Sequence, residues 1–124
     1  MYNFKEDAFY SREEDMAPGF AIISPGFGRV YFEKDAVVEE TEELLVLDAS
    51  RTFMIHFQQM EKDPSKVQIM VMRMGSMPAA PYRIMVFKNS LGMIERLRAS
   101  SDVYKNIVQN RSGLIMTPNS KMVN

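Results

Sequence analysis

The sequence predicts an α+β fold, in which an antiparallel β-sheet or small open barrel of about six strands precedes one or two C-terminal helices. Short apolar runs alternate with turn residues from residue 20 to residue 88, which is typical of an antiparallel sheet. The apolar spacing then changes from a period of two to a helical period near residue 90. A composition of 46% apolar and 25% charged residues is that of a globular domain rather than a disordered chain.

The length of 124 residues fits one domain, which we place at residues 17–117 between an N-terminal arm (1–16) and a polar tail (118–124). The chain has no Cys, which excludes disulfides and thiolate metal sites. No apolar run approaches the length that spans a bilayer, and the N-terminus lacks the apolar core of a secretory signal. We therefore expect a cytoplasmic protein that does not contact membranes.

The N-terminal arm is acidic, yet it contains the aromatic residues Tyr2, Phe4, Phe9 and Tyr10. A purely solvated tail carries few aromatic residues, and each aromatic ring removes about 150–250 Å² of surface from water when it is buried. The arm is therefore expected to dock, either on its own domain or on a neighbouring molecule.

The motif Pro-Gly-Phe occurs twice, at Pro18 and at Pro25. A phosphate-binding loop would lead into a helix and often carries a Lys, whereas Gly28 is followed by the strand-like residues 29–33. Pro-Gly is the signature of a type II turn, in which Gly takes a positive φ. The two motifs therefore predict turns on either side of a short strand at residues 20–24.

Alternating apolar residues predict the remaining strands at residues 29–33, 36–40, 44–48, 52–60, 66–74 and 82–88. The strand at 36–40 is weak, and the strands at 52–60 and 66–74 form a hairpin around residues 62–65. Helices are expected at 91–99, from the spacing of Met93, Ile94 and Leu97, and from 101 or 102 to about 111. Residues 114–116 could add a closing strand.

Methionine gathers on one side of the central strands. In a strand, alternate residues point to opposite faces, so Met70, Met72 and Met74 share a face. Antiparallel sheets usually leave one face polar, and Met is common at adaptable binding surfaces. These residues are covered either by the chain's own fold or by another protein. The candidate interface residues are Met54, Met70, Met72, Met74, Met85, Phe87, Phe4, Phe9 and Tyr10.

Charge is distributed unevenly along the chain. Residues 1–48 carry 12 acidic and four basic side chains, whereas residues 49–124 carry four acidic and 11 basic ones. The two halves could neutralise each other within one fold, pair between copies, or leave the basic half for nucleic acid. Candidate residues for single-stranded nucleic acid are Arg73, Arg83, Lys88, Arg96, Arg98 and Tyr82. The overall pI of about 5.8 argues against a dedicated nucleic-acid-binding domain.

Catalytic and metal-binding motifs are missing from the sequence. The single histidine, His56, lies in a strand without a second His or any Cys to complete a metal site. The acidic residues at 39–43 lack the spacing of a calcium loop, and no nucleophile elbow occurs. We expect no enzymatic activity, no cofactor and no metal.

These observations predict a non-enzymatic interaction or assembly protein that self-associates, or binds a protein partner, through the Met-rich face and the N-terminal arm. A viral or scaffold accessory component would have such a role. A single-stranded nucleic-acid-binding module is the alternative, and a small-molecule binder with an apolar pocket behind the methionines is a weaker third hypothesis.

Overall fold

The computed structural model describes residues 3–4, 14–25, 28–76 and 81–111. Within them, eight strands form two antiparallel sheets, and one helix, α2 (Asp102–Arg111), follows the last strand. The five-stranded sheet has the order β6-β5-β2-β1-β8, from β1 (Phe20–Ser24), β2 (Gly28–Phe32), β5 (Thr52–Gln59), β6 (Val67–Arg73) and β8 (Met93–Glu95). The three-stranded sheet has the order β3-β4-β7, from β3 (Val37–Glu40), β4 (Leu44–Asp48) and β7 (Arg83–Phe87).

The predicted α+β class is therefore confirmed, and the sheets do not close into a barrel. The strands expected between residues 20 and 88 are found, each within one residue of its predicted ends. Short 3₁₀ turns connect several of them: η1 (Lys34–Ala36), η2 (Ala49–Arg51), η3 (Met74–Ser76) and η4 (Lys88–Ser90). The second predicted helix is also confirmed as α2, and Ser101 caps it by accepting a hydrogen bond from the Tyr104 N–H at 3.2 Å.

The helix predicted at residues 91–99 is wrong, because this segment contains the edge strand β8. Ile94 lies opposite Ile22 of β1, and the N–H of Gly92 donates to the carbonyl oxygen of Ile23 at 2.8 Å. Ile94 and Leu97 pack into different cores on opposite faces of the sheet. Side chains three residues apart lie on one side of a helix but on opposite sides of an extended chain. The three-residue spacing of Ile94 and Leu97 is therefore compatible with a helix and also with an extended chain that is covered on both faces.

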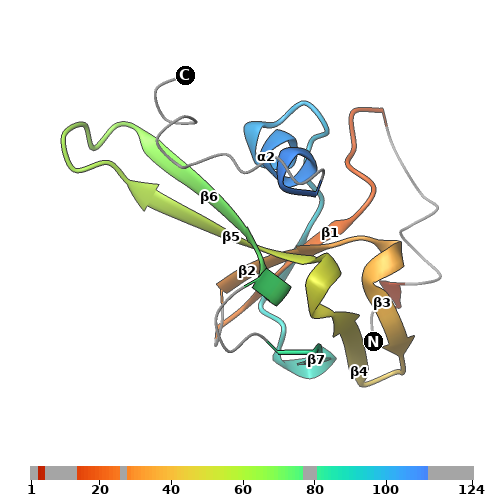
Figure 1. Cartoon of the computed structure of the whole chain (residues 1–124). Helices are drawn as coiled ribbons and strands as arrows, with labels where there is room; N and C mark the ends of the chain where they lie inside the picture. The colour runs from red at the N-terminus through yellow and green to blue at the C-terminus, as the bar shows by residue number, and fades with distance from the viewer. Residues whose placement is uncertain (1–2, 5–13, 26–27, 77–80, 112–124) are drawn as a thin grey trace.

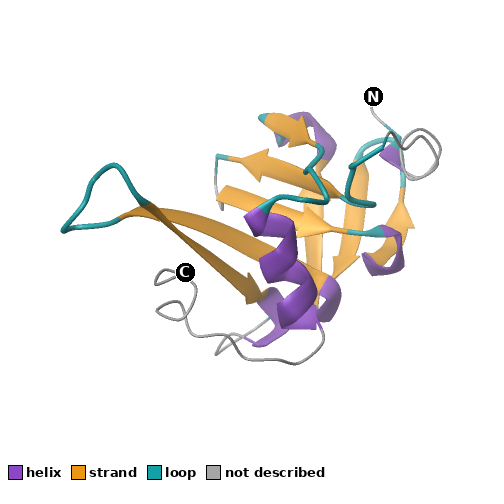
Figure 2. Ribbon diagram, turned by 90° about the horizontal axis from the view of Figure 1, so that it is seen from above, coloured by secondary structure: helices purple, strands orange, loops and turns teal. Residues whose placement is uncertain are grey.

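The two faces of the five-stranded sheet are covered by different elements. One face packs on the three-stranded sheet to form the first core, of Phe4, Phe20, Ile22, Val30, Phe32, Ala36, Leu45, Leu47 and Val86. The other face packs on α2 to form the second core, of Tyr31, Phe53, Ile55 and Ile107. Figure 1 shows α2 above the large sheet and the small sheet below it, and Figure 2 shows α2 lying across the strands. Apolar residues on both faces of β1 and β2 are therefore explained by this three-layer arrangement.

Phe4 anchors the N-terminal arm in the first core. Its ring is fully buried and makes edge contacts with the rings of Phe20 and Phe32, at centroid distances of 5.1 and 5.4 Å. The arm was expected to dock either on its own domain or on a neighbouring molecule, and Phe4 docks on its own domain. The candidate interface residues Phe9 and Tyr10, the expected strand at 114–116 and the tail at 118–124 lie outside the described residues.

Gly19 is required for space rather than for a left-handed turn. The predicted positive φ does not occur there, although the chain does bend at Pro18 and Gly19 before β1. A Cβ atom on Gly19 would lie 2.2 Å from the carbonyl oxygen of Phe32 and 2.8 Å from the Tyr31 ring. Glycine therefore lets the chain enter β1 directly against the end of β2.

Candidate functional site

A row of apolar side chains crosses the large sheet and becomes more exposed from β2 toward β6. Successive strand registers place Ile94, Ile22, Val30, Met54 and Met72 side by side on the face toward the small sheet. Ile22 and Val30 are fully buried, Met54 is half-buried, and Met72 is 44% exposed. Met54 and Met72 thus extend this apolar row onto β5 and β6, beyond the part of the face that the small sheet covers.

The outer half of the β5–β6 hairpin has only two strands. The pairing of β2 with β5 ends at Arg29 and Ile55, whereas β5 and β6 remain paired out to Gln59 and Val67. In Figure 1 and Figure 2 this hairpin projects well beyond the rest of the described chain. It carries exposed or half-exposed apolar side chains on both faces: Met70 and Met72 on one, and Phe57, Val67 and Ile69 on the other.

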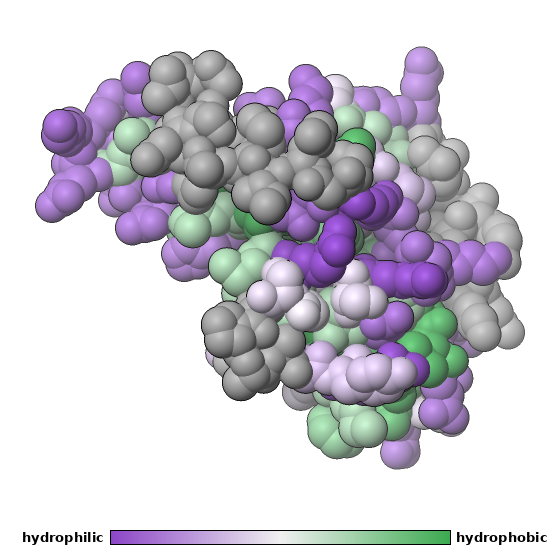
Figure 3. All heavy atoms as spheres, in the orientation of Figure 1, coloured by the Kyte–Doolittle hydropathy of each residue, from purple (hydrophilic) through white to green (hydrophobic). Residues whose placement is uncertain are grey.

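The predicted candidates do not form one continuous methionine face. Met85 and Phe87 lie on β7 in the other sheet, where each is 62% exposed. Hydrophobic residues gather over this sheet at the lower edge of the space-filling view (Figure 3). Met74 lies in η3 and packs against the first core. Only Met54, Met70 and Met72 therefore remain together, because the chain changes sheets between β6 and β7.

Two of the candidate nucleic-acid residues are engaged inside the fold. Lys88 forms a buried ion pair with Glu40 at 2.6 Å. Arg96 donates hydrogen bonds to the carbonyl oxygens of Gly19 and Ala17 and stacks on the ring of Phe20 at 4.5 Å. Both side chains hold distant segments together and are unsuited to contacts with a phosphate backbone.

The other candidate residues are spread over several elements. Arg73 donates to the carbonyl oxygens of Asn110 and Arg111, at the end of α2. Arg83 stacks on the exposed ring of Tyr82 at 4.2 Å. Arg98 lies near Asp15, close to the start of α2. The described residues thus bring Arg83 and Tyr82 together, but they do not align the six candidates along a strand-binding groove.

Ion pairs within the chain join its acidic and basic halves. Besides Glu40 with Lys88, such pairs connect Glu33 with Arg111, Asp48 with Arg83 and Asp15 with Arg98, at 3.0, 3.9 and 3.9 Å. Part of the uneven charge in the sequence is therefore neutralised inside the fold, as the first of the three predicted arrangements requires.

A chain of hydrogen bonds links the start of β1 to the end of α2. The Gly19 N–H donates to the Tyr31 hydroxyl, which donates to a Glu33 oxygen that also binds Arg111. Burial, together with the charge of Glu33 and the hydrogen bond to it, raises the pKa of Tyr31 far above its usual range. Tyr31 therefore stays protonated and acts as a structural donor.

A pocket lined by three arginines lies beside this chain of bonds, and it was not predicted from the sequence. It has a volume of about 380 Å³ and is lined by Asp35, Ser50, Arg51, Phe53, Arg73 and Arg111. These residues come from η1, η2, β5, β6 and α2. The one local signal is the short segment at 48–51, which separates the strands expected at 44–48 and 52–60.

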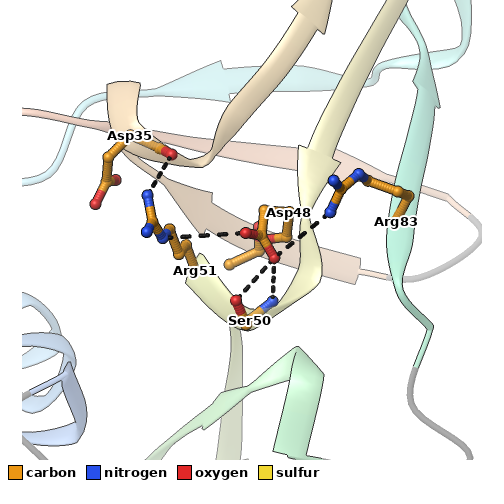
Figure 4. A network of polar contacts seen from close by, with 6 residues as sticks. Asp35, Asp48, Ser50, Arg51 and Arg83 are labelled. Atoms are coloured by element: carbon orange, nitrogen blue, oxygen red, sulfur yellow. Dashed lines mark hydrogen bonds and ion pairs between the residues drawn. The ribbon is translucent and has the colours of Figure 1, made fainter.

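Asp48 contacts two residues of the pocket lining, Ser50 and Arg51. Its carboxylate accepts hydrogen bonds from the N–H and the hydroxyl of Ser50, and it lies 4.0 Å from Arg51 and 3.9 Å from Arg83. Figure 4 shows Asp48 between the two arginines, with Arg51 reaching the carbonyl oxygen of Asp35. The hydrogen bonds from Ser50, and then the charges of Arg83 and Arg51, lower the pKa of Asp48.

Across the described ranges, no group of three or more His, Cys, Asp or Glu side chains is arranged to hold a metal ion. No described helix has the length and apolarity to cross a membrane. The chain matches no protein-family model, no curated protein and no solved structure.

Proposed function

We propose that this chain is a non-catalytic interaction protein that self-associates through the outer half of the β5–β6 hairpin. The observation that supports this most strongly is the projection of a two-stranded hairpin with exposed apolar side chains on both faces. An isolated two-stranded ribbon is marginally stable in water. A second layer or a further strand would cover these side chains and stabilise the ribbon.

The methionine side of the hairpin suits such a contact. Met72 and Met70 are flexible side chains that adapt to a partner surface, and burial contributes about 25 cal/mol for each Å² of apolar surface removed from water. Because Met72 continues a row that is fully buried at Ile22 and Val30, its burial would extend the existing core rather than create a separate one.

The open edge of β6 favours a second copy of the chain as the partner. β6 ends the strand order, and its sequence VQIMVMR has no Pro and one charged residue, at its end. Near the body, Asn110 donates to the carbonyl oxygen of Val71 and occupies the edge at that point. Farther out, an uncharged edge is a template for strand pairing, and two antiparallel β6 strands would pair symmetrically.

The test is the mass of the full chain in solution, measured by light scattering after size exclusion at low and high salt. We expect an oligomer that persists at high salt, because the contact is mainly apolar. Met72→Glu should give a folded monomer, since the new charge would be buried in the contact. Met93→Glu is the matched control, because Met93 is also exposed but lies on β8 at the opposite edge.

Three results would contradict the proposal: a monomeric wild type, an unchanged oligomer in Met72→Glu, or equal dissociation by Met93→Glu. Met85→Glu separates the two apolar surfaces. If it dissociates the oligomer while Met72→Glu does not, the contact lies on the three-stranded sheet and the hairpin proposal is wrong. A high ratio of absorbance at 260 nm to that at 280 nm on a monomeric peak would instead favour bound nucleic acid.

A further inference from the structure

The arginine pocket has a surplus of positive charge over the acids in its lining. Three arginines line it against one carboxylate, that of Asp35. Arg111 is paired with Glu33 at 3.0 Å. Arg51 donates a hydrogen bond to the carbonyl oxygen of Asp35 at 3.2 Å, but its ion pair with Asp48 is long, at 4.0 Å. Like charges are brought together at a cost, which a bound anion offsets.

Arg73 has hydrogen-bonding capacity that the described chain leaves unused. Its Nη2 atom donates to the carbonyl oxygens of Asn110 and Arg111, which places a cation at the C-terminal end of α2. Its Nε atom is buried and has no hydrogen-bond partner, and no carboxylate of the described residues forms an ion pair with it. Capping of α2 explains the position of Arg73 but not the unpaired Nε donor, which is closed to solvent and meets a ligand only when the guanidinium turns toward the pocket.

The size of the pocket sets the kind of anion. A volume of about 380 Å³ lies within the range of small-molecule sites and exceeds what a single phosphate group fills. A phosphate group carries up to two negative charges and three acceptor oxygens, which suits several guanidinium groups better than a carboxylate does. The Asp35 carboxylate is available in the lining to accept a hydrogen bond from a hydroxyl group of the same ligand.

We propose that this pocket binds a phosphorylated small molecule that carries hydroxyl groups, with Arg51 and Arg73 as the cationic groups that hold its phosphate. The pocket is built from η1, η2, β5, β6 and the end of α2, so ligand binding needs no contact from the outer hairpin. The inference is independent of self-association.

The experiment is a titration of the full, ¹⁵N-labelled chain, followed by NMR at the arginine Nε–H groups and at the backbone N–H groups of residues 50 and 51. The probes are glucose 6-phosphate and inorganic phosphate, and glucose is the uncharged control. We expect saturable shifts confined to the pocket with glucose 6-phosphate, weaker binding of phosphate, and none of glucose. Equal affinity for glucose 6-phosphate and inorganic phosphate would show that the hydroxyl-bearing part of the ligand adds nothing to binding, and this result would overturn the proposal.

Arg51→Gln tests the charge with a closely matched control. Arg51 and Arg98 are both mainly exposed, at 57% and 82%, and each has one long ion pair, of 4.0 and 3.9 Å. Arg98 does not line the pocket. Loss of a hydrogen bond to a charged group should weaken binding about tenfold or more in Arg51→Gln and leave Arg98→Gln unchanged. Equal weakening in both variants, or shifts that rise linearly at all exposed arginines, would show nonspecific attraction and overturn the proposal.

Arg73→Lys tests the role of the fork-shaped side chain. The substitution keeps a positive charge at the end of α2 but removes the Nε donor and the planar guanidinium. We expect native helix content by circular dichroism and a several-fold loss of affinity for glucose 6-phosphate. A folded Arg73→Lys variant with unchanged affinity would overturn the assignment of Arg73.

Discussion

Lys88 Nζ lies 2.6 Å from Glu40 Oε2, and the two side chains are only 4% and 3% exposed. The same glutamate oxygen accepts a hydrogen bond from the N–H of Phe4 at 2.7 Å. One buried carboxylate thus joins the end of β3, the turn after β7 and the N-terminal arm. This contact connects three segments that are far apart in the sequence.

Replacement of Lys88 by Met should destabilise the domain strongly. The variant removes the buried cation that lies 2.6 Å from the Glu40 carboxylate, and breaking a buried ion pair in this way costs about 3–5 kcal/mol of unfolding free energy. Urea denaturation of the wild type and variant measures the difference. The double variant Lys88→Met/Glu40→Met should recover more than half of the loss, because it removes both charges. A double variant as unstable as the single one would contradict this interpretation of the pair.

Phe4→Ala should also destabilise the domain, by about 3–5 kcal/mol, because it empties a fully buried position between two aromatic rings. The control is Tyr82→Ala, which removes an exposed ring and should change the unfolding free energy by less than about 1 kcal/mol. Thermal and urea unfolding measure both variants. If Phe4→Ala behaves like Tyr82→Ala, the arm contributes little to the core.

The Asp48 network predicts a loss of stability in acid. Hydrogen bonds from Ser50, and then Arg83 and Arg51, hold the pKa of Asp48 in the folded chain below its ordinary value of 3.8. A carboxylate with a depressed folded pKa stabilises the fold fully above its unfolded pKa, and this contribution disappears as the pH falls through the folded value. The stabilisation is therefore complete above about pH 5 and declines below 3.8.

The measurement is the thermal unfolding midpoint of wild type and Asp48→Asn between neutral pH and the most acidic pH at which both fold. The difference should be constant at neutral pH and shrink in acid. Glu61→Gln, which changes a carboxylate in the loop of the β5–β6 hairpin, controls for net charge. A difference that grows as the pH falls would have the wrong sign for this network.

Local patterns predicted the strands and α2 because each depends on nearby residues. Pro18 and Gly19 form a bend directly before β1, and Pro25 lies directly after it, whereas Gly26 lies outside the described residues. Ser101 identified the start of α2. The helix predicted at 91–99 was wrong because Ile94 and Leu97 have a helical spacing but pack into two different cores. A sequence alone does not show that both faces of a strand are covered.

The candidate sites were harder to predict because they depend on contacts between distant segments. Met70 and Met72 were correctly placed on one face by strand alternation, but Met85 belongs to another sheet. The choice of sheet depends on strand pairing, which the local period does not encode. In the same way, Arg51 and Arg111 meet at a pocket only after η2 and α2 have packed against the same strands.

The buried carboxylate of Glu40 also constrains the order of events during synthesis. Ribosomes release the chain from its N-terminus, so Phe4 and Glu40 leave the exit tunnel well before Lys88. Until residues 86 and 88 emerge, Glu40 lacks its contact with Lys88, and the site for Phe4 lacks Val86 of the first core. The contacts of Phe4 and Glu40 in the first core are therefore complete only after residue 88 has been made. We therefore expect the docking of Phe4 to be a late step, which completes the domain instead of initiating its folding.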